Sequence, residues 1–590
     1  MCGICGEITL DADPPHEGAV ERMMDVMRRR GPDGAGIFAG KNILLGHRRL
    51  KIIDLSEASN QPIVDSQLGL SIVFNGAIYN YRELRGELEA KGYRFFSHGD
   101  TEVILKSYHA WGKDCVLRFN GMFAFAIAES ATGRTFLARD RLGIKPLYYA
   151  RNGNTLRFAS SLPALLAAGD VDKSIDPIAL NYYLSFHAVV PPPYTILKGV
   201  RKLAPATTWI LEPDGREIME TYWSLRFDTP ADRKNWSEED WKTAALDVMR
   251  LAVKRRLVAD VPVGVLLSGG LDSSLIVGLL AEHDRALMDT FSIGFESVNN
   301  EEGNEFKYSD VIADTFKTKH HKLFINAART IPALRECVAQ MSEPMTSHDN
   351  VGFYLLSQEV SKFVKVVQSG QGADEIFGGY HWYPPMLGST NAFETYSRHF
   401  FDRDFAEYRE MVSPDFVSKD YAADFVRHHF AAPGAQAPID QALRIDALIM
   451  LVDDPVKRVD NNTMAASLEA RVPFLDHEVV EFAATVPPGL KIREGGKFIL
   501  KEAARRIIPA EVIDRPKGYF PVPALKYLRG DFLELARGCL TNKKARRRGL
   551  FQKPYIDMLL ADPEAYITPL HGSKLWQAAV LELWLQTHDI

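Results

Sequence analysis

The sequence predicts two folds in succession, an α+β layer domain rich in strands and then an α/β domain built on a parallel sheet. The chain has 590 residues, which is enough for several domains of ordinary size. Short strand-like runs separated by turn residues dominate the first part of the chain. Further along, apolar runs alternate with helical patterns, as they do in proteins with a parallel sheet.

Strand-like runs define the first domain. The clearest lie at residues 42–55, 69–80 and 121–130, and turn residues separate them. Only a few helical patterns intervene, such as the one at residues 80–93. We therefore expect sheets covered by a small number of helices.

A polar, proline-containing segment at residues 227–240 marks the boundary between the domains. Ser237, which acidic residues follow, predicts the start of the next helix. We place the first domain at residues 1–220, a linker at 221–240 and the second domain at 241–590.

Alternating strands and helices define the second domain. Such alternation predicts a doubly wound parallel sheet, whose ligand sites lie at the carboxyl ends of its strands. Two later stretches are expected to be mostly helical, residues 390–450 and 530–590. The strands are expected at 261–267, 289–295 and 363–369, and the helices between them at 273–283 and 308–317.

Composition excludes several classes of protein. Hydrophobic residues make up 46% of the chain and charged residues 25%, close to the average for a globular protein. These values exclude a disordered chain, a collagen-like fibre and a small disulfide scaffold. The 70 basic and 76 acidic side chains give a net charge of −6, so nucleic acid is disfavoured as a partner. No apolar run is long enough to predict a membrane span.

The N-terminal segment and the cysteines indicate a cytoplasmic protein. Residues 1–13 lack the basic and apolar regions of a secretory signal. The cysteines are scattered and odd in number, which favours a reducing compartment over a disulfide framework. The five are Cys2, Cys5, Cys115, Cys337 and Cys539.

Cys2 directly follows the initiator methionine. If Met1 is removed, Cys2 carries both a thiol and a free α-amine, whose pKa of about 7.7–8.0 in model compounds suits a general base. Nucleophile and base then share one residue, as in enzymes with an N-terminal threonine. Cys2 and Cys5 also match a redox C-x-x-C motif, but a strand is expected after them where that motif needs a helix. A zinc site would need a second ligand pair, and an ordinary buried cysteine is the remaining alternative.

Further motifs follow Cys2 in a characteristic order. They are Arg30-Gly31-Pro32-Asp33-Gly34, His47-Arg48-Arg49-Leu50, Asn75-Gly76 with Ile78-Tyr79-Asn80, Gly99-Asp100-Thr101-Glu102 and Ala138-Arg139-Asp140-Arg141-Leu142-Gly143. In order and spacing they resemble the class II, or N-terminal-nucleophile, glutamine amidotransferase domain. The resemblance implies an αββα fold in which Cys2 hydrolyses glutamine.

The same resemblance implies a glutamine pocket. Glutamine is a zwitterion, so its carboxylate needs a guanidinium and its ammonium needs a carboxylate. By resemblance, Arg49 takes the first role and Asp100 the second. The Asn75 side chain and the Gly76 backbone N–H would form the oxyanion hole. The full set implied for glutamine binding is Arg49, Leu50, Ile53, Asn75, Gly76 and Asp100.

One position departs from the family pattern. The family has N-G-E, whose glutamate assists with the glutamine ammonium, whereas this chain has Asn75-Gly76-Ala77. The ammonium therefore loses one expected partner. An inert domain that only docks the second half of the chain is the alternative, although the retained Cys2 and Arg49 argue against it.

The second domain begins with a phosphate-type loop. Residues 268–274, S-G-G-L-D-S-S, lie between an expected strand and helix, where small residues let backbone N–H groups approach a phosphate. The loop lacks the ending of a Walker A motif and resembles the pyrophosphate loop of the ATP pyrophosphatase family. The resemblance implies binding of ATP and pyrophosphate by Leu266, Ser268, Gly269, Gly270, Asp272, Ser273, Ile293, Ser369 and Gly370.

Two later segments resemble asparagine synthetases. The first is residues 369–380, and by this resemblance Asp272 and Asp374 would hold Mg²⁺ beside pyrophosphate as hard oxygen ligands. The second spans residues 451–501, in which Lys497 matches a lysine that stabilises the adenylation transition state. We assign structural roles to Lys457, Arg458 and Arg471.

Together the two halves resemble asparagine synthetase B-type enzymes over nearly the whole chain. The resemblance implies glutamine hydrolysis at Cys2, passage of ammonia through an internal channel, and attack on an acyl-adenylate formed with ATP and Mg²⁺. The expected small molecules are glutamine, ATP and a carboxylate acceptor, with no nucleic acid or membrane partner. A homodimer is compatible with the resemblance, although the residues do not determine the oligomeric state.

The acceptor is inferred from a second departure. Asparagine synthetases carry Glu or Asp where this chain has Gln371, near the amino-acid pocket, where it would take part in catalysis. A neutral amide suits a substrate without a free α-ammonium, and residues 186–203 and 342–385 resemble the N-acetylglutaminylglutamine amidotransferase branch. That branch amidates an N-blocked dipeptide to make an osmolyte. The alternatives are aspartate, another carboxylate, a β-lactam synthetase-like ring closure, which Cys2 disfavours, and a non-catalytic homologue.

Overall fold

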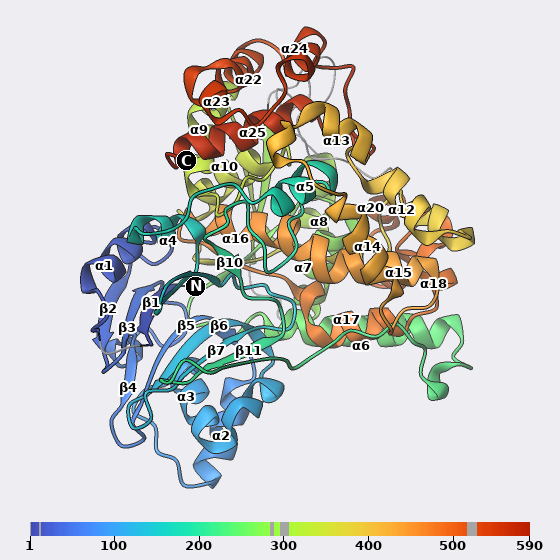
Figure 1. Cartoon of the computed structure of the whole chain (residues 1–590). Coiled ribbons are helices and arrows are strands. Elements are labelled where there is room, and N and C mark those ends of the chain that lie inside the picture. The colour runs from blue at the N-terminus through green and yellow to red at the C-terminus, as the bar shows by residue number, and fades with distance from the viewer. Residues whose placement is uncertain (1, 11–12, 284–287, 296–305, 516–527) are drawn as a thin grey trace.

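Two stacked antiparallel sheets form the first part of the chain (Figure 1). The computed structural model describes residues 2–10, 13–283, 288–295, 306–515 and 528–590. The first sheet has the order β10-β8-β9-β1-β3-β2 and the second β12-β11-β7-β6-β5-β4. The strands of the first are β1 (Gly3–Thr9), β2 (Gly34–Ala39), β3 (Ile43–Arg49), β8 (Tyr148–Asn152), β9 (Thr155–Ala159) and β10 (Arg201–Lys202). Those of the second are β4 (Ile63–Asp65), β5 (Leu70–Ile78), β6 (Gly121–Glu129), β7 (Thr135–Arg139), β11 (Thr207–Leu211) and β12 (Glu217–Thr221).

Apolar side chains between the two sheets form one core, which includes Ile4 of β1, Val73 of β5 and Leu137 of β7. Helices cover both outer faces, and a second core lies beneath those on the β5 side. They are α1 (Glu17–Val26) and α4 (Leu162–Ala168) on one side and α2 (Tyr81–Ala90) and α3 (Asp100–Trp111) on the other. This αββα order confirms the predicted fold class of the first part.

A five-stranded sheet with all its pairings parallel organises the second part, in the order β15-β14-β13-β16-β17. Its strands are β13 (Val263–Leu266), β14 (Asp289–Phe295), β15 (Lys319–Ile325), β16 (Val366–Gln368) and β17 (Glu469–Arg471). The helices that alternate with them include α7 (Leu271–His283), α8 (Phe306–Phe316), α9 (Thr330–Gln340) and α10 (Asn350–Val360). The parallel sheet is confirmed, but β15 and β17 were not predicted, because β15 is rich in Lys and His and β17 has three residues.

The remaining helices surround this sheet. α6 (Glu238–Arg255) begins where Ser237 predicts it, because the Ser237 side chain and Asp240 form a reciprocal capping box. The stretches expected to be helical contain α12 (Ala392–Phe400), α13 (Phe405–Met411), α14 (Tyr421–Ala431), α15 (Pro438–Ile445), α22 (Asp531–Thr541), α23 (Lys543–Arg548), α24 (Lys553–Ala561) and α25 (Lys574–Thr587). Outside those two stretches the chain also forms α11 (Ala373–Phe377), α16 (Lys457–Met464), α17 (His477–Thr485), α18 (Pro488–Ile492), α19 (Phe498–Ala504) and α20 (Ala510–Ile513).

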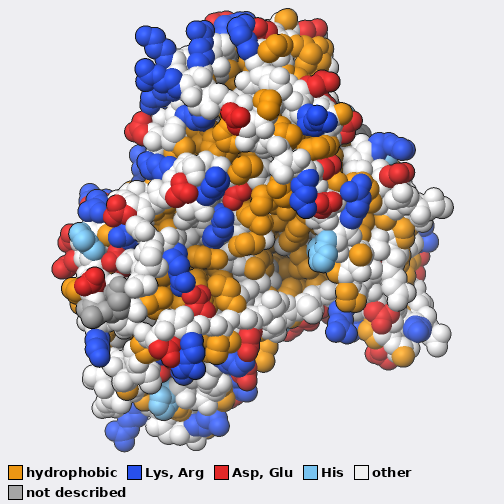
Figure 2. All heavy atoms as spheres, viewed as in Figure 1, with side chains coloured by type: hydrophobic (Ala, Val, Ile, Leu, Met, Phe, Trp, Pro, Cys, Tyr) orange, Lys and Arg blue, Asp and Glu red, His pale blue; other side chains and the backbone are white. Residues whose placement is uncertain are grey.

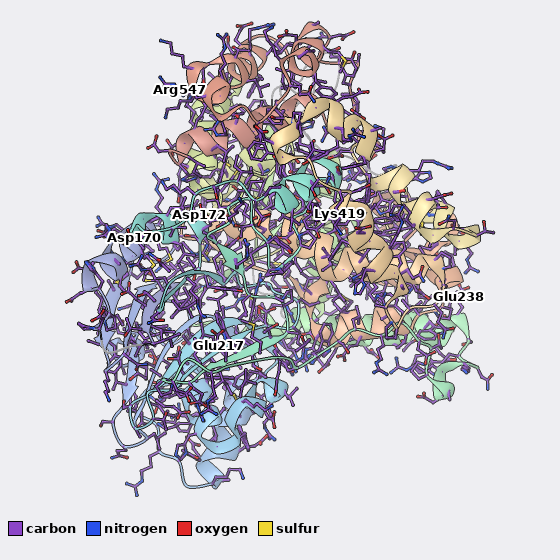
Figure 3. All side chains as sticks on the ribbon, in the orientation of Figure 1. Asp170, Asp172, Glu217, Glu238, Lys419 and Arg547 are labelled. Atoms are coloured by element: carbon purple, nitrogen blue, oxygen red, sulfur yellow. The ribbon has the colours of Figure 1, made fainter. Side chains whose placement is uncertain are left out.

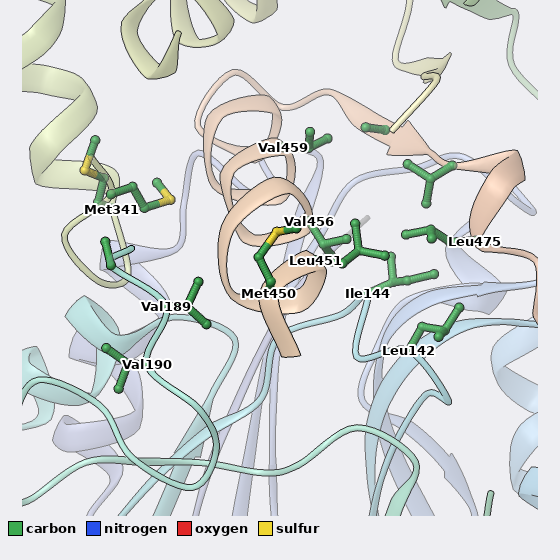
Figure 4. Packing of buried hydrophobic residues seen from close by; sticks show 14 of the residues in the cluster. Leu142, Ile144, Val189, Val190, Met341, Met450, Leu451, Val456, Val459 and Leu475 are labelled. Atoms are coloured by element: carbon green, nitrogen blue, oxygen red, sulfur yellow. The ribbon is translucent and has the colours of Figure 1, made fainter. Parts of the chain in front are cut away.

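The two parts share one apolar cluster (Figure 4). Leu142 and Ile144, which follow β7, pack with Met450 and Val456 from the helical segment 446–464. Val189 and Val190, which follow α5 (Pro177–Ser185), and Met341 after α9 belong to the same cluster. Buried ion pairs cross this junction as well, from Arg30 to Asp460 at 2.9 Å and from Lys202 to Asp453 at 2.6 Å. The two parts are therefore joined by both apolar and ionic contacts.

Charges of both signs occupy the outside. On the face in Figure 2, Lys and Arg side chains are interspersed with Asp and Glu. Among the charged side chains labelled in Figure 3, Asp170, Lys419 and Arg547 are exposed. Within the described residues, none of the helices combines the length and the hydrophobicity needed to cross a bilayer.

Candidate active sites

Cys2 lies immediately before β1 and is nearly buried. Its backbone N–H donates to Asn75 Oδ1 at 3.1 Å, so β1 and β5 hold the two residues together. Burial raises the pKa of the Cys2 thiol, which therefore needs a base to ionise it at neutral pH. The predicted base is the α-amine of Cys2, which removal of Met1 would expose. Met1 itself lies outside the described residues. Cys5 lies inside β1 with no helix after it, so a redox C-x-x-C site does not fit.

Asn75 and Gly76, the two residues predicted to form the oxyanion hole, are neighbours on β5. Asn75 is fully buried, and its Nδ2 has no hydrogen-bond partner among the described residues. A buried amide donor without a partner costs free energy unless a ligand satisfies it. At Gly76 the strands approach so closely that a Cβ would lie 2.1 Å from the Met122 carbonyl oxygen. Glycine is therefore needed where the backbone borders the pocket.

Asn75→Ala is expected to lower kcat for glutamine hydrolysis by about 10²- to 10³-fold with a smaller change in KM. The side-chain donor acts on the negative oxygen that forms during attack rather than on the bound amide. Glutamate release at saturating glutamine measures the effect. A change confined to KM would show that Asn75 only binds the substrate.

A pocket lies beside Cys2. Arg49 lines it and is held in place, because its Nη1 donates to the Ser56 carbonyl at 2.7 Å and to Asn60 Oδ1 at 2.6 Å. Its Nη2 donates to the Asp54 carbonyl. The lining includes five of the six residues expected to bind glutamine, and Asn75 adjoins it through Cys2. The lining residues are Cys2, Arg49, Leu50, Ile52, Ile53, Ser59, Gln61, Phe74, Gly76, Asp100, Thr101, Glu469 and Arg471.

Asp100 begins α3 and faces the same pocket. Burial raises its pKa to about 6, and the charge of Glu469 adds to the rise. The Ile78 backbone N–H, which donates to Asp100 Oδ2 at 3.0 Å, and Arg471 oppose it. An ammonium bound here would stabilise the carboxylate.

The KM for glutamine is expected to rise about tenfold between pH 7 and pH 5. An acid whose pKa lies near 6 becomes protonated below that pH, and the neutral acid attracts an ammonium far less than the carboxylate does. Initial rates of glutamate release across this range give KM. Asp100→Asn should bind glutamine weakly at every pH, and a flat KM profile in the unaltered chain would contradict the prediction.

The second site lies at the carboxyl ends of the parallel strands. The loop after β13 enters α7 with Gly269 at φ +72°, and Ser268 Oγ lies 3.1 Å from Ser273 Oγ. Most residues expected to bind ATP line one pocket here, although Gly269 and Gly270 are absent from its lining. The lining residues are Leu266, Leu267, Ser268, Asp272, Ser273, Phe291, Ser292, Ile293, Phe306, Ser309, Asp349, Phe353, Leu356, Ser369, Gly370, Gln371, Gly372, Asp374, Glu375 and Tyr380.

Lys497 brings the two predicted metal ligands together. Its Nζ lies 2.7 Å from Asp272 Oδ2 and 2.9 Å from Asp374 Oδ1. Burial alone would lower the pKa of this ammonium, but the two carboxylates hold it above its usual range. Lys497 adopts φ +54°, and a Cβ on Gly379 would collide with Asp374 and Lys497. The backbone is therefore shaped to let these three side chains meet.

The oxygen donors fit Mg²⁺, which needs only one or two protein carboxylates when substrate phosphates and water complete its shell. Among the described residues there is no group of three or more His, Cys, Asp or Glu side chains placed to hold a metal. A cage made entirely by those residues is thus not available, and the Asp272–Asp374 pair suits a phosphate-bound ion.

Comparison with known proteins places this architecture in a family. A model described as "Asparagine synthase" matches residues 244–586, and one described as "Glutamine amidotransferase domain" matches residues 1–223. The chain belongs to the asparagine synthase family. Together with the amidotransferase domain, this membership makes the chain a ligase that uses glutamine as its nitrogen donor. The predicted type of enzyme is confirmed.

The curated relatives extend over the whole chain. "Asparagine synthetase [glutamine-hydrolyzing] 3" of Bacillus subtilis is 32% identical, with 100% of this chain and 98% of the relative covered. A "Putative asparagine synthetase [glutamine-hydrolyzing]" of Mycobacterium tuberculosis is 33% identical, with 99% and 97% covered. "Asparagine synthetase B [glutamine-hydrolyzing]" of Escherichia coli is 29% identical, with 88% and 82% covered.

Several residues that line the two pockets of this chain are not predicted from the sequence. Glu469 and Arg471 reach the Cys2 pocket from β17, although Arg471 had been assigned a structural role. Asp349 and Phe353 of the ATP-side pocket lie on or next to α10, and no local motif marks them. Lys457 and Arg458 do form buried or partly buried ion pairs, to Asp453 and Asp454.

Proposed function

We propose that this chain transfers the amide nitrogen of glutamine to an acceptor carboxylate activated with ATP, and that the acceptor is N-acetylglutaminylglutamine. The observation that carries the choice of acceptor is Gln371, a neutral amide that lines the ATP-side pocket where asparagine synthetases have an acid. An acidic side chain there could pair with the α-ammonium of aspartate. An N-acetylated substrate has no such charge to satisfy.

In the first step the Cys2 thiolate attacks the glutamine carboxamide carbon. The oxyanion forms beside Asn75 Nδ2 and the Gly76 N–H. The α-amine of Cys2 then passes the proton it took from the thiol to the leaving nitrogen, so that collapse of the oxyanion expels ammonia and leaves a thioester. Water then cleaves the thioester, which restores the thiol and releases glutamate. Arg49 and Asp100 hold the two charged ends of glutamine during both events.

In the second pocket the acceptor carboxylate attacks the α-phosphorus of ATP. This forms an acyl-adenylate and expels pyrophosphate. Lys497, whose Nζ contacts Asp272, would neutralise phosphate charge, and residues 268–273 would offer backbone N–H groups at the start of α7. Mg²⁺ held by Asp272 and Asp374 would supply further neutralisation of the phosphates.

Ammonia attacks the acyl carbon, displaces AMP and loses a proton to give the amide. We expect ammonia to cross the junction between the two parts, where the apolar cluster in Figure 4 includes residues of both. The five cysteines are all free thiols, which supports a reducing compartment such as the cytoplasm. A homodimer stays a prediction.

The wall of the ATP-side pocket around Gln371 also supports a larger substrate. Phe353 and Leu356 line it, and Tyr380 stacks on Trp382 with ring centroids 4.1 Å apart. Asp446 fixes this wall by accepting a hydrogen bond from Trp382 Nε1 at 2.9 Å and one from Tyr383. Apolar and aromatic surface suits an acetylated dipeptide better than the short aspartate side chain.

The test is pyrophosphate release from ATP and Mg²⁺ with glutamine, with N-acetylglutaminylglutamine and aspartate supplied separately. Release with the dipeptide, and a product lighter by about 1 Da because NH₂ replaces OH, would support the proposal. Turnover of aspartate alone would make the chain an asparagine synthetase, as its relatives are named. Retention of Met1 and no pyrophosphate release with any acceptor would indicate a non-catalytic homologue.

A further inference from the structure

Two charged residues of the second domain form one wall of the Cys2 pocket. Glu469 and Arg471 lie two positions apart on β17, so both side chains point to the same side of the strand. Arg471 Nε donates to Glu469 Oε1 at 2.5 Å. Both residues are almost completely buried. The glutamine pocket is therefore not made by the amidotransferase domain alone.

Arg471 holds this pair in place. Its Nη1 donates to the carbonyls of Arg256 at 2.9 Å and Val258 at 2.7 Å, just beyond α6. Its Nη2 is buried without a hydrogen-bond partner among the described residues. A buried charged donor without a partner is costly. Arg471 therefore keeps one buried donor that the described residues leave unsatisfied and that a ligand in the pocket would satisfy.

Ala77 stands where the family has a glutamate, so the carboxylate of Glu469 in the same pocket becomes important. Along β5, side chains alternate, so Ala77 and Tyr79 share the face that carries Asn75. Arg471 lies over the Tyr79 ring, with its guanidinium carbon 5.6 Å from the ring centroid. The pair on β17 thus adjoins the face from which the family's glutamate would project. Among the described residues lining this pocket, the carboxylates are Asp100 and Glu469.

We propose that Glu469 is a glutamine-binding residue that supplies the second carboxylate for the substrate α-ammonium, and that Arg471 is the residue that positions it. The influence of Glu469 on the pKa of Asp100 supports closeness of the two carboxylates. An ammonium between them relieves their repulsion and compensates for the glutamate that Ala77 replaces. The inference rests on the proposed hydrolysis of glutamine in this pocket.

The test compares kcat/KM for hydrolysis of two substrates, glutamine and glutaramate. Glutaramate has the same amide and carboxylate as glutamine but no α-ammonium. Glu469→Gln is expected to lower kcat/KM for glutamine about 10- to 100-fold, the loss typical of a hydrogen bond between charged groups. The value for glutaramate should stay within about twofold, since that substrate never uses the carboxylate. Glu469→Asp, which retains the charge, should keep most of the preference for glutamine.

Glu7→Gln is the matched control. Glu7 is a buried glutamate of the amidotransferase domain, paired with Arg157 at 2.7 Å and outside both pockets, so its loss should leave the preference unchanged. Equal losses with both substrates, or no loss in Glu469→Gln, would overturn the proposal. The proposal would also be overturned if Glu469→Gln lowered the thermal unfolding midpoint and Glu469→Asp showed no preference for glutamine over glutaramate. Because glutamate release needs no acceptor, a wrong acceptor would not affect this result.

Discussion

Replacing Cys2 with alanine is expected to abolish glutamine-dependent amidation while leaving amidation with free ammonium salts within a few-fold of its original rate. The loss should exceed about 10³-fold, as expected when the nucleophile of a covalent mechanism is removed. The thiol takes no part in the second pocket, where Asp272, Asp374 and Lys497 meet. Glutamate and pyrophosphate release, each measured with glutamine and with ammonium, separate the two half-reactions.

Cys5→Ala provides the control for this experiment. Cys5 lies three residues further along in β1 and is completely buried, so its substitution tests the effect of losing a thiol near the same site. It should lower stability slightly through a small cavity and leave glutamate release intact. Glutamate release that survives in Cys2→Ala would show that another group attacks glutamine.

The parts of the two sites that could be predicted from the sequence are those carried by short local motifs on or next to strands. Cys2 lies just before β1 and the loop at 268–274 joins β13 to α7, whereas Asn75 lies within β5 next to a glycine. Small residues and polar groups at such points have few structural reasons to occur together. The αββα layers could be predicted too, since the N-terminal motifs resembled a family with that fold.

The wall made by β17 could not be predicted, because its contacts join residues far apart in the chain. Arg471 bonds to carbonyls more than 200 residues earlier, and Glu469 faces Asp100 across nearly 370 positions. β17 is a three-residue edge strand with charged residues at both ends, so it has no apolar alternation. Its place depends on pairing with β16, which the sequence does not reveal.

Lys497→Met is expected to reduce pyrophosphate release by about 10²-fold or more, with glutamate release preserved. The ammonium lies between two carboxylates, 2.7 Å and 2.9 Å away, and would meet the phosphate charge that develops as pyrophosphate leaves. Methionine keeps most of the volume but removes the charge. Without it, Asp272 and Asp374 repel each other, so the Mg²⁺ concentration needed for half-maximal activity should change as well. Initial rates over a range of Mg²⁺ concentrations measure both effects.

Lys501→Met is the matched control because Lys501 lies one turn further along α19, where its Nζ donates to the Glu494 carbonyl at 3.1 Å. The same change of residue there removes a charge from the same helix but not from the pocket. Loss of pyrophosphate release in both variants would point to the helix rather than to the ammonium. A normal rate in Lys497→Met would mean that phosphate charge is neutralised without Lys497, and would leave the carboxylate pair as the centre of the site.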